Sequence, residues 1–153
     1  MDYDHALTIR RPPEAVFAMM ADIQEYIHAP NSPVPEMEKI PPGPTIVGTR
    51  WREVVKLLPF VTMTMWSDCT ALVPDRRLEL DWHGPGMTGH ITYTMEPTDG
   101  DTVFRQVETV TPRGLMRLFG GLMERMLAPR LTARMEAIRD VLEGRDSRAG
   151  QPV

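Results

Sequence analysis

Hydrophobic and polar residues alternate with a period of two along several stretches of the chain. The alternation is clearest in residues 3–10, 61–72, 77–83 and 88–96, where apolar side chains occupy nearly every second position. Successive side chains of a β-strand point to opposite faces of a sheet, so this pattern is typical of strands with one buried and one solvated face. We therefore predict strands over these four stretches.

Three further stretches predict strands from a weaker pattern. The stretch over residues 37–40 is short, and the stretch over residues 49–57 is polar on one side. Residues 102–111 are strand-like, but the pattern leaves their inward face open and allows a bulge. Two pairs of residues compete for the apolar face of this last strand, namely Val103 with Val107 and Phe104 with Val110.

Two short helices are predicted after the first strand. Pro13 and Glu14 suit the first turn of a helix over residues 15–20, because proline tolerates that position and an acidic side chain favours the positive end of the helix dipole. Asp22 can cap a second short helix that continues through Tyr26. A loop is expected at residues 29–35.

The longest helix-compatible stretch covers residues 114–143. A helix of that length would extend about 45 Å. Its apolar residues recur at spacings of three and four, and the stripe changes register near Pro129. Gly120 and Gly121 weaken the first half of the helix. Two interpretations stay open, a bent first half that leans over a cavity and a tolerated irregularity.

These elements predict an α+β fold. Short turns separate the strands, so the sheet should be an antiparallel meander of about seven strands. One face of the sheet is apolar and needs a cover, and the last helix is the element large enough to provide it. We expect a single domain over residues 1–143 and a polar, flexible tail over residues 144–153.

Composition narrows the classes of protein that the chain can represent. Of its 153 residues, 42% are hydrophobic and 25% are charged, as in soluble globular proteins. The net charge of −4 gives no overall electrostatic attraction to nucleic acid or to an anionic membrane surface.

The arginines of the last helix are interleaved with Leu and Met, which favours a solvated face of an amphipathic helix. The single cysteine, Cys69, is expected to be a buried, unreactive thiol. No apolar run has the length of a membrane span and no signal-peptide core is present, so we expect a cytoplasmic protein without stable membrane insertion.

Four groups of residues, in chain order, resemble the landmarks of a known superfamily. They are Ile9-Arg10-Arg11-Pro12-Pro13-Glu14-Ala15-Val16-Phe17 followed by Asp22, then Gly43-Pro44 with Val47-Gly48-Thr49-Arg50, then Val73-Pro74-Asp75-Arg76-Arg77-Leu78, and finally Tyr93-Thr94-Met95-Glu96-Pro97 with Gly100-Asp101-Thr102. Over residues 3–143 the chain resembles the polyketide cyclase/dehydrase-like group of the START and birch-pollen-allergen-like (SRPBCC) superfamily. The chain departs from this group at Tyr26, near which a tryptophan is common, and at Asp101, where glycine is usual.

The resemblance implies a helix-grip fold, in which a curved sheet wraps round the C-terminal helix and encloses an apolar cavity. It therefore implies a hydrophobic small molecule as the partner. The superfamily has no universal set of catalytic residues, so the catalytic residues stay unknown. Neither a cofactor nor a metal is implied.

Inward apolar residues of the strands and of the last helix are the candidate ligand-binding residues. Flexible thioethers and aromatic rings suit a cavity that adapts to apolar ligands, and the chain has twelve methionines. The alternative is that these residues are ordinary core. The candidates are Trp51, Met63, Met65, Leu80, Trp82, Tyr93, Met95, Phe119, Met123 and Met126.

Glu53, Arg105 and Glu108 are the polar strand residues expected to reach the cavity. A carboxyl buried without a partner has a raised pKa and can act as a general acid or base. The alternative is that these residues form exposed ion pairs on the outer face. The four histidines lack the spacing of metal ligands, so no metal site is expected.

Three functions fit these patterns. The first is a binding protein for a hydrophobic small molecule, such as a lipid, a polyketide-like or an aromatic compound. The second is a metal-free enzyme of the cyclase/dehydrase type, which a buried ionisable residue or polar pair in the cavity would favour. The third is a protein-interaction module, which an exposed apolar patch would favour. Whether the chain is an enzyme stays open at this point.

Overall fold

The computed structural model describes residues 1–26 and 36–144. The loop expected at residues 29–35 and the tail residues 145–153 lie outside the described residues. The elements follow in the order β1 (Asp2–Ile9), α1 (Pro13–Ala21), η1 (Ile23–Tyr26), β2 (Glu36–Ile40), β3 (Arg50–Leu58), β4 (Val61–Val73), β5 (Arg77–Gly84), β6 (Met87–Thr98), β7 (Asp101–Pro112), η2 (Gly114–Phe119) and α2 (Gly120–Leu142), where η marks a 3-10 helix.

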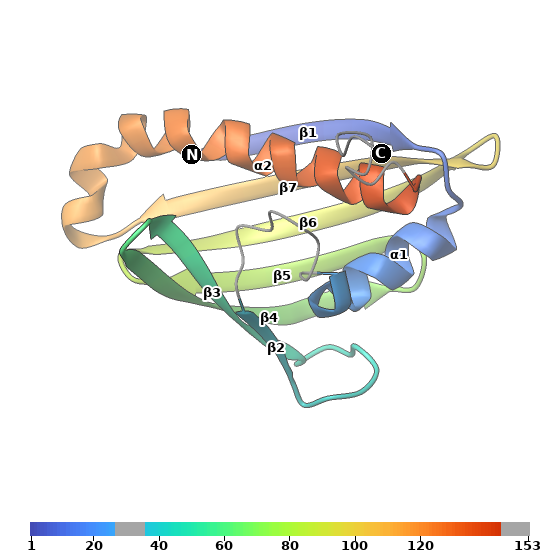
Figure 1. The fold of residues 1–153 in the computed structure, drawn as a ribbon, viewed down its shortest axis with the longest axis horizontal. Coiled ribbons are helices and arrows are strands. Elements are labelled where there is room, and N and C mark those ends of the chain that lie inside the picture. Colours follow the sequence, from blue (N-terminus) through green and yellow to red (C-terminus); the bar gives the residue numbers. More distant parts are fainter. Residues whose placement is uncertain (27–35, 145–153) are drawn as a thin grey trace, which may run out of the picture.

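The seven strands form one antiparallel sheet in the order β1-β7-β6-β5-β4-β3-β2. Strands β2 to β7 are neighbours in sequence and in space, and β1 closes the order beside β7 (Figure 1). The short turns therefore do produce the predicted meander, because two strands joined by a few residues can pair only in opposite directions.

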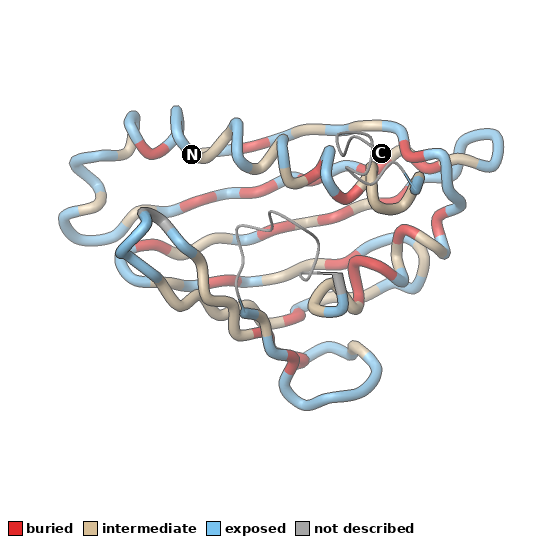
Figure 2. Tube along the Cα trace, in the orientation of Figure 1, coloured by how far each residue is buried: buried red, intermediate tan, exposed pale blue. Residues whose placement is uncertain are grey.

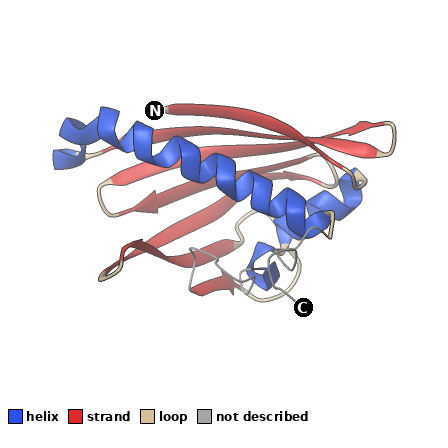
Figure 3. Cartoon of the chain, turned by 45° about the horizontal axis from the view of Figure 1, so that its top comes forward, coloured by secondary structure: helices blue, strands red, loops and turns tan. Residues whose placement is uncertain are grey.

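Helix α2 lies across the concave side of the sheet, with its backbone nearest to β1, while α1 packs on β5, β6 and β7 (Figures 1 and 3). The second half of α2 buries Met135 and Ile138, and α1 buries Val16, Met19 and Met20. These side chains join the apolar residues of the strands in one core. The predicted α+β helix-grip fold, with two short helices after the first strand, is confirmed.

Strand β7 settles the facing that its sequence left open. Its register with β1 and β6 runs without a shift, so the bulge that the sequence allowed does not form. Phe104 and Val110 are buried, while Val107 is 39% exposed. Figure 2 shows this alternation along the strand. The even-numbered positions of β7, from Thr102 to Val110, therefore face the core.

A register shift in β4 reverses the facing of the residues after it, so that Leu72 rather than Ala71 packs against the core. Pairing with β5 shifts between Cys69 and Ala71, which is the signature of a β-bulge. Upstream of it, Trp66 points to the outer face, where the Arg50 guanidinium lies 5.7 Å from the centre of its ring. This contact shields the indole that interrupts the polar face of the strand.

The predicted helical stretch over residues 114–143 is present, and the structure divides it into two segments. The structure has a 3-10 helix over Gly114–Phe119 and an α-helix that begins only at Gly120. Gly114 has φ of +57°, a conformation that glycine adopts without strain, and it lets the chain turn away from β7. Pro129 lies inside α2, and the helix continues on both sides of it.

Candidate functional site

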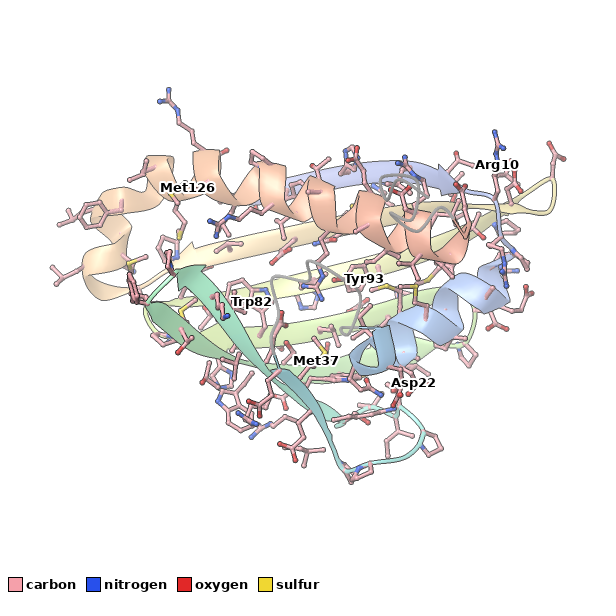
Figure 4. All side chains as sticks on the ribbon, in the orientation of Figure 1. Arg10, Asp22, Met37, Trp82, Tyr93 and Met126 are labelled. Atoms are coloured by element: carbon pink, nitrogen blue, oxygen red, sulfur yellow. The ribbon has the colours of Figure 1, made fainter. Side chains whose placement is uncertain are left out.

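The predicted ligand-binding residues separate into a buried and an exposed group. Trp51, Trp82, Tyr93, Met95 and Met123 are buried in the core, and Met65 and Leu80 pack against it from half-buried positions. Met63 is also half-buried. Figure 4 shows Trp82 and Tyr93 in the part of the sheet that lies between α2 and β3 in this view. The strand residues of this group therefore lie on the inner face of the sheet, which the alternation predicts, and Met123 of α2 packs in the same core.

Two residues of the predicted wall lie elsewhere. Phe119 is 54% exposed and Met126 is 49% exposed. Phe119 ends the 3-10 helix η2, whose residues are turned by a different angle from those of a regular α-helix. The first part of the stripe read from the sequence, at Leu115, Phe119 and Leu122, is therefore exposed. The buried position there is Met123.

Arg105 also lies outside the core, and its placement corrects the expectation that it reaches a cavity. It sits at an odd position of β7 and faces the outer side, where it forms an ion pair with Asp4 of β1. Both side chains are half-exposed. This is the exposed ladder pair that the sequence offered as the alternative.

Glu108 is the buried acidic residue of the concave face, with only 4% of its surface exposed. Its Oε1 atom accepts a hydrogen bond of 2.9 Å from Nε1 of Trp82, and its Oε2 atom accepts one of 2.7 Å from Nε2 of Gln106. Both bonds are buried. Gln106 and Glu108 come from alternate positions of β7, and Trp82 comes from β5. The inward alternation of two strands thus builds the cluster.

The environment of Glu108 favours its protonated form. Burial raises its pKa above the ordinary value of 4.5, because a charged carboxylate loses its water shell in the core. Hydrogen bonds from Gln106 and Trp82 and the nearby Arg134 cation lower the pKa and offset part of this rise. The result is a buried carboxyl that holds its proton to higher pH than a solvated glutamate does.

Arg134 brings the last helix into the cluster. Its guanidinium lies 4.0 Å from Oε1 of Glu53, and the two side chains are 34% and 14% exposed. The charge of Arg134 also acts on Glu108 and Tyr93. The sequence interpretation of the helix arginines as a solvated face is therefore wrong at this position. The signal was available, because Arg134 lies three residues after Leu131 and four before Ile138, within the apolar stripe.

Two tyrosines complete the polar part of the site. Tyr93 stacks on Phe104 with 5.7 Å between ring centres, and burial raises the pKa of its hydroxyl to about 12. The Tyr3 hydroxyl lies 2.8 Å from Oγ1 of Thr132 and 3.7 Å from the sulfur of Met135. Both tyrosines therefore stay neutral at physiological pH. Sequence analysis missed Tyr3, Gln106 and Thr132, because each is an ordinary polar residue until the register places it.

We refer to Glu53, Trp82, Tyr93, Gln106, Glu108 and Arg134 as the concave polar cluster. It combines hydrogen-bond donors, acceptors and one cation with the aromatic and thioether side chains of the core. Within residues 1–26 and 36–144, no group of His, Cys, Asp and Glu side chains could hold a metal ion. The donors and acceptors of the cluster are suited to hydrogen bonding and to proton transfer by the side chains themselves.

Two open recesses of about 380 Å³ each are present, and the lining of the second includes Trp82 of this cluster. One is formed by Arg10, Arg11 and the end of α2 at Val141–Gly144. The other is lined mainly by outward residues of β5, β6 and β7, among them Asp81 and His90, whose Oδ1 and Nδ1 atoms are 2.6 Å apart. An enclosed cavity under α2 stays a prediction.

Comparison with known proteins matches this architecture. A family model described as polyketide cyclase / dehydrase and lipid transport matches residues 2–143. A search of curated proteins returned no match. No helix within the described residues has both the length and the apolar character needed to cross a bilayer.

Several solved structures share the fold at low sequence identity. The Zhui aromatase/cyclase from Streptomyces sp. R1128 aligns with a TM-score of 0.75 and 17% identity over 99% of each chain. A protein from Arthrobacter aurescens aligns with a TM-score of 0.71 and 15% identity over 94% of this chain and 86% of the other. Ara h 8.0201 aligns with a TM-score of 0.66 and 14% identity over 94% and 95%. At these identities the structures support the fold alone.

Proposed function

The chain belongs to the polyketide cyclase/dehydrase and lipid transport family, and we propose that it binds a hydrophobic small molecule between the concave face of its sheet and α2. The observation that carries this proposal is the concave polar cluster. Glu108 is held in the core by Trp82 and Gln106, on the same face as the buried Tyr93. A purely structural core has little need of a buried carboxyl, since burying one costs free energy.

The cluster also supports a class of ligand. A compound with an apolar body would contact the aromatic and thioether side chains, such as Trp51, Met65 and Met123. Its hydroxyl or keto groups would pair with Glu108 and Arg134, which offer a proton donor and a cation. Aromatic and polyketide-like compounds carry both features. We also propose that the protein acts in the cytoplasm.

A second function, catalysis of the cyclase/dehydrase type, is favoured by the raised pKa of Glu108. In a dehydration, a protonated Glu108 would give its proton to a leaving hydroxyl group, which departs as water. The carboxylate formed in this way would then take the proton from the neighbouring carbon as the double bond forms. Glu108 would end the cycle protonated, so the atoms balance without a cofactor.

Binding of a neutral apolar dye, Nile red, tests the proposed face. Trp51→Ala and Trp82→Ala should weaken dye binding while circular dichroism shows a retained fold, because both side chains lie on the concave face. Trp66→Ala is the matched control, since Trp66 lies on the outer face beneath Arg50. Unchanged binding in both concave variants would remove the assignment. Independently of the dye, native mass spectrometry of the protein purified from its own host would identify a small molecule that co-purifies with it.

A further inference from the structure

A stripe of large apolar side chains is exposed where the last helical segment begins. Leu115 and Leu118 are each 79% exposed, and Leu122 is 58% exposed. Phe119 and Met126 belong to the same stripe at 54% and 49%. Soluble proteins rarely expose apolar residues in such a continuous group, and where they do, the group marks a contact surface.

A second apolar feature lies at the same end of the molecule. Phe60 and Val61, at the turn between β3 and β4, are 97% and 44% exposed. Figures 1 and 3 both show this turn and the start of the last helical segment at one end of the structure. We call the exposed side chains of these two elements the apolar end: Phe60, Val61, Leu115, Leu118, Phe119, Leu122 and Met126.

The charge around the apolar end differs from that of the whole chain. Residues 113–126 contain three arginines and one glutamate, a local net charge of +2, whereas the chain carries −4. Arg113, Arg117 and Arg125 are exposed, and within the part of the chain that the structure describes they form no ion pair. Lys56, near the β3–β4 turn, is also exposed. The apolar end therefore carries unpaired positive charge.

We propose that the apolar end docks onto the surface of a lipid bilayer that contains anionic headgroups. Apolar side chains of an amphipathic helix enter the boundary between headgroups and acyl chains, while its arginines pair with the phosphates. A fluid bilayer can accept projecting side chains from two separate elements without a matching shape. We propose peripheral docking, since no described helix combines the length and the apolar character needed to span a bilayer.

The charges argue against a second copy of the chain as the occupant. An interface between two apolar ends would bring three arginines from each copy together, with one glutamate each to oppose them. Like charges in such an interface are unfavourable. An anionic surface removes this repulsion and gives each arginine a partner. The proposal goes beyond ligand binding by the concave face and does not depend on it.

Flotation with vesicles tests the proposal directly. The full chain is mixed with vesicles of phosphatidylcholine alone, or of phosphatidylcholine and phosphatidylglycerol in equal parts, at low and high salt. We expect the protein to bind the anionic vesicles at least about tenfold more strongly, and salt to weaken the binding by screening the arginines. Weak binding that is equal on both kinds of vesicle would overturn the proposal.

Paired variants separate docking from general changes in the protein. Leu118→Asp should lower vesicle binding by about tenfold or more, and Arg117→Glu by about fivefold or more. Val47→Asp, at a position 60% exposed on another loop, and Arg76→Glu, at the exposed turn between β4 and β5, should leave vesicle binding unchanged. Equal losses in the control variants would contradict the assignment of the surface.

Two further measurements test whether the apolar end binds another partner in place of a bilayer. Analytical ultracentrifugation that shows self-association, removed by Leu118→Asp while vesicles are not bound, would overturn the proposal in favour of an interface between copies. Binding to an acidic protein with no binding to vesicles would overturn it in the same way. Trp82→Ala, which tests the concave face, should keep its vesicle binding, so failure of the two proposals can be told apart.

Discussion

The Trp82 indole extends across strand β6 to reach Glu108 on β7, with 2.9 Å between Nε1 and Oε1. Gly89 is the residue of β6 that faces Trp82, and Glu108 pairs with Ile91 two positions further along. A Cβ atom at position 89 would lie only 2.4 Å from Cε2 of the indole. A glycine on the middle strand therefore makes room for the hydrogen bond that anchors the buried carboxyl.

Gly89→Ala should displace the Trp82 ring and break its bond to Glu108. Overpacking of a well-packed core costs about 1–3 kcal/mol, and the lost bond leaves a buried carboxyl with one partner fewer. We expect the free energy of unfolding in urea to fall by this amount and the tryptophan emission to shift.

Gly121→Ala is the matched control for this substitution. A Cβ atom at position 121 meets nothing within 4 Å, and the residue lies in α2. Alanine there should leave stability unchanged or raise it by up to about 1 kcal/mol, since glycine is the poorer helix former. Equal stability of the Gly89→Ala variant and the wild type would show that the indole can move at no cost.

Glu108→Gln should change how stability depends on pH. Burial raises the pKa of Glu108 in the folded state above its ordinary 4.5. Its contribution is therefore complete below pH 4.5 and is lost as the pH rises through the folded-state pKa, because the buried group must then ionise. The variant has no such loss.

The difference in unfolding free energy, variant minus wild type, should therefore grow as the pH rises above 4.5 and level off above the folded-state pKa. Urea unfolding at a series of pH values measures this difference. A difference that stays constant across the series would show that Glu108 titrates as a solvated carboxyl. Substitution of the exposed Asp4, whose pKa the hydrogen bond from Arg105 lowers from its ordinary 3.8, should give a slope of opposite sign, and only below about pH 4.

Much of the fold could be predicted because the sheet has one solvated face and one buried, apolar face. Residues 77–83 and 88–96 alternate clearly, and the turns between strands are short enough to force antiparallel pairing. The facing of β7 could not be predicted, since apolar residues occupy both of its faces. Val103 and Val107 face outward although valine is as apolar as the inward Val110. The facing is decided only by the pairing of β7 with its neighbour on each side, β1 and β6.

The site was less predictable than the fold. Glu108 and Arg105 are equally plausible inward residues in a strand of unknown facing, and the register made one a buried acid and the other a surface partner of Asp4. Arg134 was missed because an arginine in a helix is normally solvated. Its position within the apolar stripe was the stronger signal, because spacing decides which way a helical side chain points.

Cys69 should resist thiol reagents in the folded protein. Its side chain is 2% exposed, and burial raises the pKa of its thiol, so little reactive thiolate forms. The rate of reaction with an aromatic disulfide reagent should be on the order of a hundredfold or more lower than in urea-unfolded protein. A folded-state rate close to the unfolded rate would mean that the bulge next to Cys69 opens readily.

Arg134→Met should raise the pKa of Glu108 further. The Arg134 cation favours the ionised carboxylate of Glu108, and its loss also leaves the negative charge of Glu53 without its nearest cation. Both changes favour the protonated form, so they act in the same direction.

Titration of the Glu108 side-chain carboxyl carbon by NMR measures this pKa. The Arg134→Lys variant, which keeps the charge, should have a Glu108 pKa closer to that of the wild type. A pKa that falls or stays unchanged in Arg134→Met would show that Arg134 does not stabilise the ionised carboxylate of Glu108. If Glu108 supplies a proton to a bound substrate, the alkaline limb of the activity profile should move to higher pH in the same variant, because the acid form then persists further.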